Sequence, residues 1–295
     1  FRSLYLLHPV NSEAICWISA RPYIYFTTIQ FSIYILWLLY RNSKKIGYYI
    51  VLNSIFALSI ITLKAPWLMT IPIVLLLLDI FYLDTFQIVK KTKSTKLFTW
   101  IKKEVFGIKN VSAILSYTTP AIIAGLFTFS YVQAAFSTRV SDLQNKYYFD
   151  PTNTTPFLNR IPYVLSMALK FMVFPKDLSI YHEGNVISNI KYLIMIWITF
   201  AITFILIKMW KENKRIIAGL ILSMYAALAP SFSPVAIAWL SAERYYYMAS
   251  MFFCILLAIL IVKIQDKNKH LGSAILGIIL VIYAVRTAVR TNDFV

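Results

Sequence analysis

Long apolar runs separated by short polar segments restrict what this chain can fold into. Runs suited to membrane spans cover residues 23–40, 47–63, 67–83, 111–132, 190–210, 216–235, 245–262 and 271–285. Hydrophobic residues make up 59% of the chain and charged residues only 14%, whereas a soluble domain is about one-quarter charged. Because a bilayer offers no water to exposed backbone groups, such runs cross it as helices. We therefore predict an all-α polytopic membrane protein with about eight spans, folded as one domain over residues 1–295.

The basic residues orient these spans. Basic segments lie at residues 41–45, 90–109, 211–215 and 263–269. All four basic segments lie on the same side of the membrane only if residues 161–175 do not cross it. These residues are short for a membrane span and contain Lys170. We predict a re-entrant or interfacial helix there and place the basic side in the cytoplasm, because cytoplasmic loops are enriched in Lys and Arg. Topology thus accounts for the net charge of +17, and we expect no nucleic-acid partner.

A polar motif, His8 to Arg21, precedes the first clear span on the predicted outer face. Asn11 or Ser12 could cap a short helix there by accepting a backbone N–H bond. Glu13, Trp17 and Arg21 recur at every fourth position, which predicts one stripe on that helix. The stripe either binds a polar ligand or forms an interfacial anchor with a snorkelling arginine.

Three cations lie at span ends on the outer side, where the positive-inside rule disfavours them: Arg21, Lys64 and Arg244. Such a set suits a lipid-linked phosphate at the membrane surface. Ordinary snorkelling, or pairing of Arg244 with Glu243, would also explain it. No residues have the spacing of a metal site.

Two further observations concern residues inside the apolar runs. Asp79 is an acid within a span, near its cytoplasmic end, and we expect it to face the interface or to pair within the bundle. Cys16 lies at a membrane face and Cys254 inside a span, so we expect no disulfide between them.

Several motifs, in this order, resemble those of the transmembrane-and-tetratricopeptide glycosyltransferases, a GT-C family that includes protein O-mannosyltransferases. The motifs are His8 to Arg21, Lys64-Ala65-Pro66 with the apolar run to Asp79, Phe174-Pro175-Lys176-Asp177-Leu178-Ser179, Glu243-Arg244-Tyr245-Tyr246-Tyr247-Met248-Ala249-Ser250 and Val289-Arg290-Thr291-Asn292-Asp293-Phe294. The chain departs from the family pattern at Ala65, which replaces an acid, at Ala20, which replaces a Gly, and at Pro22. These differences put any role of the missing acid in doubt.

The resemblance implies a membrane glycosyltransferase that moves a sugar from a polyprenyl-phosphate donor to a protein acceptor on the luminal or periplasmic face. It implies a general-base acid in a loop before Phe1 and tetratricopeptide repeats after residue 295, so we expect a fragment that is inactive by itself. The candidate residues for binding the lipid phosphate or substrate are His8, Glu13, Arg21, Lys64, Glu243, Arg244 and Tyr245.

The expected partners are the lipid-linked sugar donor, the protein acceptor and membrane lipid, with no cofactor assigned and metal dependence left open. The expected location is a bacterial inner membrane, with the endoplasmic reticulum membrane as the alternative. A non-enzymatic transporter or flippase of lipid-linked glycans is the alternative function. Transporters often contain inverted repeats, and this sequence shows no repeat.

Overall fold

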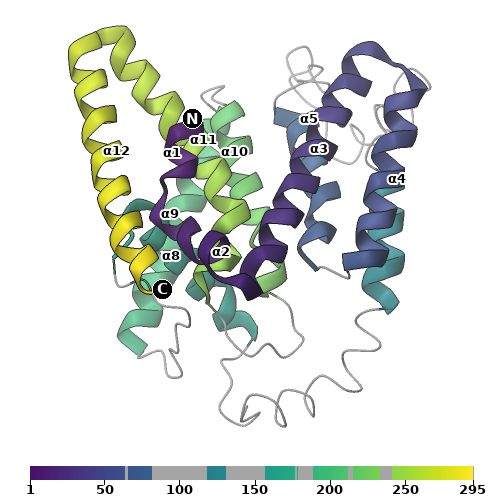
Figure 1. Cartoon of the computed structure of the whole chain (residues 1–295), viewed down its shortest axis with the longest axis horizontal. Helices are drawn as coiled ribbons and strands as arrows, with labels where there is room; N and C mark the ends of the chain where they lie inside the picture. Colours follow the sequence, from purple (N-terminus) through teal and green to yellow (C-terminus); the bar gives the residue numbers. More distant parts are fainter. Residues whose placement is uncertain are drawn as a thin grey trace. The chain divides into compact units, whose positions relative to one another are not determined.

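The computed structural model describes residues 1–63, 66–81, 118–130, 157–176, 178, 189–211, 215–232 and 241–294, and every regular element in these ranges is a helix. The chain divides into two compact units. Unit 1 contains residues 1–27 and 132–295, and unit 2 contains residues 28–131. Each unit is described separately below, and Figure 1 labels their helices.

Four helices in the described ranges are long and apolar enough to cross a membrane. They cover Ile18–Ser43, Tyr192–Met209, Glu243–Lys267 and Lys269–Asn292. Shorter apolar helices cover Ile46–Thr62, Trp67–Phe81, Thr118–Ser130 and Arg215–Ala226. The expectation of an all-helical chain is thus confirmed for the described residues, and these four apolar helices support its placement in a membrane. The count of about eight spans stays a prediction.

Unit 2 contains most of α3 (Arg21–Ser43), with α4 (Ile46–Leu63), η3 (Pro66–Thr70), α5 (Ile71–Phe81) and the helix Thr118–Ser130. Lys44 turns the chain from α3 into α4 with a left-handed backbone (φ 57°), and its N–H donates to the Tyr40 carbonyl at 2.8 Å. Such a residue commonly ends a helix.

A buried ion pair joins two helices of unit 2. The carboxylate of Asp79 on α5 is fully buried and lies 2.7 Å from the Arg41 guanidinium at the end of α3. The Trp37 ring lies 5.9 Å from the same guanidinium. The expected pairing of Asp79 within the bundle is confirmed, and burial of two opposite charges together avoids the cost of an isolated ion.

Unit 1 begins with four short elements and the start of α3. The short elements are α1 (Arg2–Leu6), η1 (Pro9–Asn11), α2 (Ser12–Cys16) and η2 (Ile18–Ala20). The later elements are α8 (Phe157–Val173), α9 (Asn189–Lys211), α10 (Arg215–Ala226), η7 (Ala229–Phe232), η8 (Glu243–Tyr246), α11 (Tyr247–Lys267) and α12 (Lys269–Asn292).

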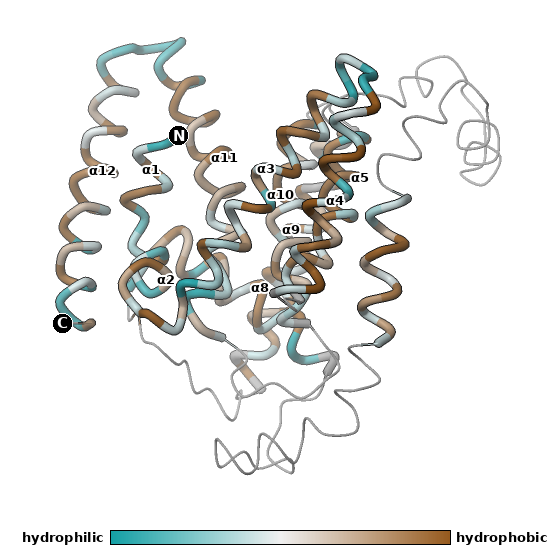
Figure 2. The backbone as a smooth tube through the Cα atoms, turned by 45° about the vertical axis from the view of Figure 1, so that its right-hand side comes forward, coloured by the Kyte–Doolittle hydropathy of each residue, from teal (hydrophilic) through white to brown (hydrophobic). Residues whose placement is uncertain are grey.

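The helices α11 and α12 form an antiparallel hairpin with a very tight turn. Asn268 caps α12, since its side-chain oxygen accepts from the Leu271 N–H at 3.0 Å. Gly272 lies so close to Gln265 that an added Cβ would stand 2.7 Å from the Gln265 backbone nitrogen. Only glycine allows the two helix ends to approach this closely. Figure 2 shows both helices largely hydrophobic along their length, with hydrophilic residues at the turn.

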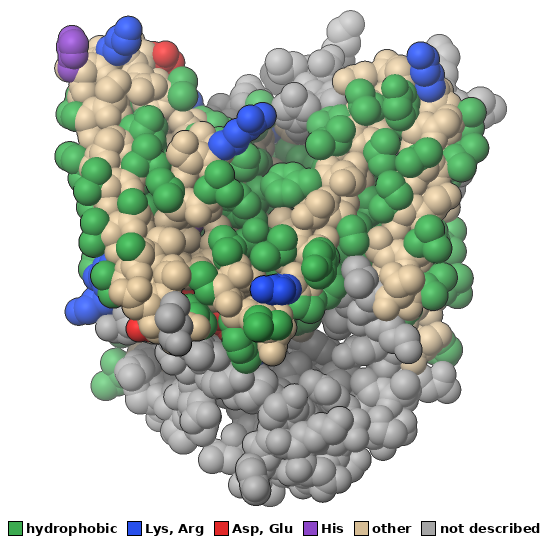
Figure 3. All heavy atoms as spheres, viewed as in Figure 1, with side chains coloured by type: hydrophobic (Ala, Val, Ile, Leu, Met, Phe, Trp, Pro, Cys, Tyr) green, Lys and Arg blue, Asp and Glu red, His purple; other side chains and the backbone are tan. Residues whose placement is uncertain are grey.

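Apolar contacts hold α1 against this hairpin. Leu4 packs with Cys254 and Ile261 of α11 and with Tyr283 of α12 in one buried cluster. The chain then continues into η1 and α2, which contact η8 and α12. These short elements therefore lie at the end of unit 1 opposite the α11–α12 turn (Figure 1). In Figure 3 the sides of the hairpin are mostly hydrophobic, and a His and basic side chains lie at the turn.

Two segments differ from the expected bounds. The run 216–235 was expected to be one span, but α10 ends at Ala226 and η7 follows. Pro230 explains the change, because it has no N–H to donate to the Ala226 carbonyl and its ring would clash with that carbonyl in a continued α-helix. The helix expected over 161–175 is observed as α8, which begins at Phe157. Its re-entrant placement stays a prediction.

Candidate functional site

Buried charged side chains from three distant parts of the sequence meet at one end of unit 1. They belong to α2, to η8 and to the last turn of α12, and we call this group the ion-pair cluster: Glu13, Glu243, Arg244, Arg290 and Asp293. The four residues other than Asp293 are at most 7% exposed. Charges are rarely buried without partners, so the pairing within this cluster is what makes the burial possible.

Glu13 binds Arg244 through both of its carboxylate oxygens. One oxygen accepts from the Arg244 backbone N–H at 2.8 Å, and the other accepts from the guanidinium Nη1. The guanidinium carbon lies 4.9 Å from the Trp17 ring centre and 5.1 Å from that of Tyr245. Two aromatic faces and one carboxylate thus fix the guanidinium in place.

Glu243 binds Arg290, on the last turns of α12. Its carboxylate accepts from Nη2 of Arg290 at 3.0 Å and from Nε at 3.3 Å, which is the two-point geometry that arginine favours with carboxylates. Nη1 of the same guanidinium donates to Asp293 at 2.6 Å. This pair ties η8 to α12, just as Glu13 ties η8 to α2.

Neutral hydrogen bonds reinforce the same junction. Ser250 on α11 donates to the side-chain oxygen of Asn11 at 2.9 Å, and the amide of Asn11 donates to the Tyr5 carbonyl at 2.7 Å. In the loop before η1, both ring nitrogens of His8 are engaged. Nδ1 accepts from the Val10 N–H at 3.3 Å, so Nε2 carries the proton that is donated to the Met172 carbonyl at 3.1 Å.

Burial shifts the proton affinities of two of these groups. It lowers the pKa of His8 to about 4, although the Met172 carbonyl acts in the opposite direction. Burial also raises the pKa of Glu13, and the adjacent Arg244 opposes this rise. His8 is therefore neutral at physiological pH, as its hydrogen bonds require.

The structure corrects the expected stripe on the first motif. The short helix α2 ends at Cys16, Trp17 has an extended backbone, and α3 starts at Arg21. Glu13 and Trp17 still meet on Arg244, whereas Arg21 lies exposed. The expected cap is also wrong. Neither Asn11 nor Ser12 makes a capping bond for α2, and the His8 side chain caps η1 instead.

The partner of Arg244 differs from the alternative considered from the sequence. Glu243 forms an ion pair with Arg290, and Arg244 forms an ion pair with Glu13. The Tyr245 ring flanks the Arg244 guanidinium, and its predicted role in binding the lipid or substrate stays a prediction. Lys64 lies outside the described residues.

Arg290 was missed as a member of the site, although its motif was recognised. Its signal is visible in the sequence, since Arg286 and Arg290 are spaced four residues apart at the predicted outer end of a span. Arginine at that end runs against the positive-inside rule and so calls for a specific partner. The identity of that partner, Glu243, could not be read from spacing.

No family model, curated protein or solved structure matches this chain at a significant level.

Proposed function

We propose that this chain belongs to a membrane glycosyltransferase of the GT-C type, which transfers a sugar from a polyprenyl-phosphate donor to a protein acceptor on the outer face. One observation carries the proposal. Three motifs that resemble the family come from the start, the η8 segment and the end of the chain, and they converge on the ion-pair cluster. Motifs that are distant in the sequence are expected to meet in the structure if they form one functional site.

In this proposal Arg244 contacts the phosphate of the donor. A guanidinium has five N–H donors in a fixed fork, so it can bind a carboxylate at one corner and a phosphate at another. Glu13 occupies the Nη1 corner, the Tyr23 hydroxyl is a further hydrogen-bond partner, and Trp17 and Tyr245 hold the faces. A donor phosphate would share the guanidinium with these groups. A positive charge fixed in this way stabilises the negative charge that develops on the departing lipid phosphate.

The other candidates take supporting roles. Glu243 positions η8 by holding Arg290, and His8 joins the first motif to α8 through Met172. Neither Glu13 nor Glu243 is proposed as the general base, because each carboxylate already accepts from an arginine.

The ion-pair cluster has an excess of negative charge, so by itself it attracts a phosphate weakly. Its three carboxylates outnumber its two guanidinium groups. We therefore propose that Arg21, an exposed cation of the same unit, supplies further attraction for a phosphate.

Sugar transfer by Arg244→Lys full-length protein, compared at matched folded amounts, tests this assignment. Lysine keeps the charge but loses the fork, so we expect transfer to fall about tenfold or more, since a charged hydrogen bond contributes roughly 1.5–3 kcal/mol. Arg290→Lys is the matched control, because it makes the same change in the neighbouring buried pair. Its turnover per folded molecule should stay near that of the wild type.

Two outcomes would contradict the proposal. Normal transfer by Arg244→Lys would remove Arg244 from the phosphate site. A wild-type protein that moves lipid-linked glycan across vesicles, yet transfers no sugar to any acceptor, would favour the transporter instead.

A further inference from the structure

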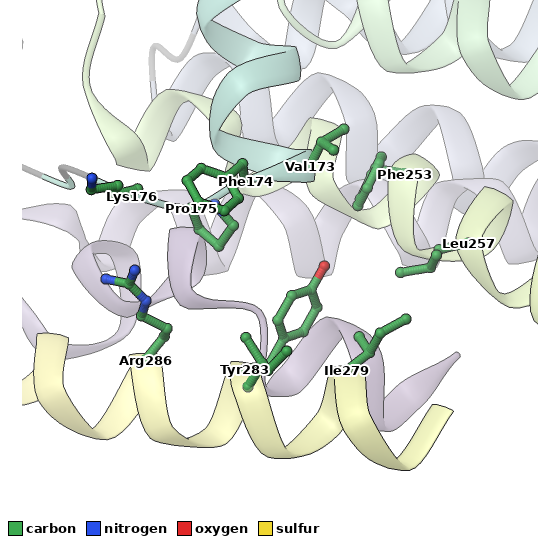
Figure 4. A pocket seen from close by; sticks show the side chains of 10 residues that line it. Val173, Phe174, Pro175, Lys176, Phe253, Leu257, Ile279, Tyr283 and Arg286 are labelled. Carbon is green, nitrogen blue, oxygen red and sulfur yellow. The ribbon is translucent and has the colours of Figure 1, made fainter. Parts of the chain in front are cut away.

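A pocket separate from the ion-pair cluster opens between the end of α8 and the α11–α12 hairpin (Figure 4). Its volume is about 290 Å³. The residues that line it are Val173, Phe174, Pro175, Lys176, Phe253, Leu257, Ile279, Ile282, Tyr283 and Arg286. All but Lys176 and Arg286 are apolar or aromatic, so this pocket is suited to a largely hydrocarbon ligand.

The two cations lie together at one end of the pocket. In Figure 4, Lys176 and Arg286 are on the same side, and Leu257 and Ile279 are on the other. Arg286 precedes Arg290 by one turn, so it is close to the predicted outer surface. Ile279 is seven residues deeper, which is about 10 Å along the axis of α12. The pocket therefore changes from cationic at the interface to apolar at depth.

These cations differ from those of the ion-pair cluster. Both side chains are exposed, and no carboxylate in the described part of the chain forms an ion pair with either. Two like charges at one mouth repel each other, and an anion between them removes that repulsion. Arginine and lysine are also the side chains that most commonly bind phosphate.

We propose that this pocket binds one anionic glycerophospholipid of the outer leaflet. Its phosphate lies between Lys176 and Arg286, and one acyl chain enters the apolar part beside Leu257 and Ile279. A strip of exposed apolar residues on α12 provides a surface for the second chain: Ile278, Val281, Ile282 and Val285.

Charge selects the headgroup. A zwitterionic lipid would bring its own ammonium next to two cations, whereas phosphatidylglycerol adds only negative charge. The bound lipid would join the end of α8 to the hairpin, and hence brace the last turn of α8, where the Met172 carbonyl contacts His8. This inference does not depend on sugar transfer.

Native mass spectrometry of the delipidated protein, titrated with phosphatidylglycerol or with phosphatidylcholine of the same chains, measures this preference. We expect one phosphatidylglycerol to bind roughly tenfold or more tightly than phosphatidylcholine, from the charge-assisted contacts that it makes. In Lys176→Gln/Arg286→Gln the two lipids should bind equally. The matched control is Lys269→Gln, which removes an exposed cation at the other end of α12.

A second variant tests the apolar part of the pocket. Ile279→Trp fills it and leaves both cations in place, so phosphatidylglycerol binding should weaken severalfold. Unchanged binding in Ile279→Trp would show that no chain enters the pocket. Equal binding of the two lipids by the wild type would overturn the headgroup assignment, as would binding of a polyprenyl phosphate without any binding of phosphatidylglycerol.

Discussion

Removal of the Glu13–Arg244 pair in two steps should reveal a strong energetic coupling. The changes are Glu13→Gln and Arg244→Met, made singly and together. Glutamine keeps an oxygen for the Arg244 backbone N–H but loses the charge. Methionine keeps an unbranched, polarisable side chain between Trp17 and Tyr245, so packing is largely retained.

The expected magnitudes follow from the burial of both groups. Glu13 is fully buried and the Arg244 side chain is 7% exposed. Each single change leaves a buried charge without its partner, which costs about 3–5 kcal/mol. The loss of unfolding free energy caused by Arg244→Met should be smallest at low pH. Burial already raises the pKa of Glu13, so its carboxyl group can accept a proton and become neutral. The double variant has no buried charge at either position. Its loss of unfolding free energy should therefore be much smaller than the sum of the losses in the two single variants.

Unfolding free energies in mixed detergent micelles measure this coupling. We expect a coupling energy of at least about 2 kcal/mol, in the range found for close charge pairs. Losses that add to within about 0.5 kcal/mol would refute the reasoning, because independent sites behave in that way. Such a result would mean that η8 and α2 are held together by packing alone.

Two further predictions concern neighbouring contacts. Glu243→Gln should destabilise the protein by about 3 kcal/mol, because the buried Arg290 guanidinium then loses the carboxylate that holds it at two points. Lys269→Gln, which removes an exposed cation from the same helix, should cost under about 0.5 kcal/mol. Equal losses of unfolding free energy would contradict this. The folded state binds a proton at His8 only near pH 4, but the unfolded chain does so near pH 6.5, so stability should fall by roughly 3 kcal/mol as pH drops through this window. His8→Gln, which can still donate to the Met172 carbonyl, should lose this pH dependence, and its persistence would exclude His8 as the cause.

The sequence alone was sufficient for the class of fold and for the grouping of the motifs. Lipid requires every backbone N–H and C=O to be bonded internally, so apolar runs indicate helices whatever their side chains contact. Each predicted span takes the chain to the other side of the membrane, and this alternation predicts that the His8 and Glu243 motifs lie on the same face. The contact between these motifs in unit 1 agrees with this prediction. The pairing of Asp79 could be anticipated for a similar reason, since a buried acid needs a partner.

Tertiary structure decided which charges pair. Glu243 and Arg244 are adjacent in the sequence, but successive side chains on a 3₁₀ helix point about 120° apart. One side chain therefore faces α12 and the other faces α2. Similarly, the extended backbone at Trp17 breaks the expected stripe and separates Arg21 from Glu13. The ion-pair partner of each charged residue depends on the direction of its side chain and on the packing of helices distant in the sequence. The spacing of residues in the sequence gives information on neither.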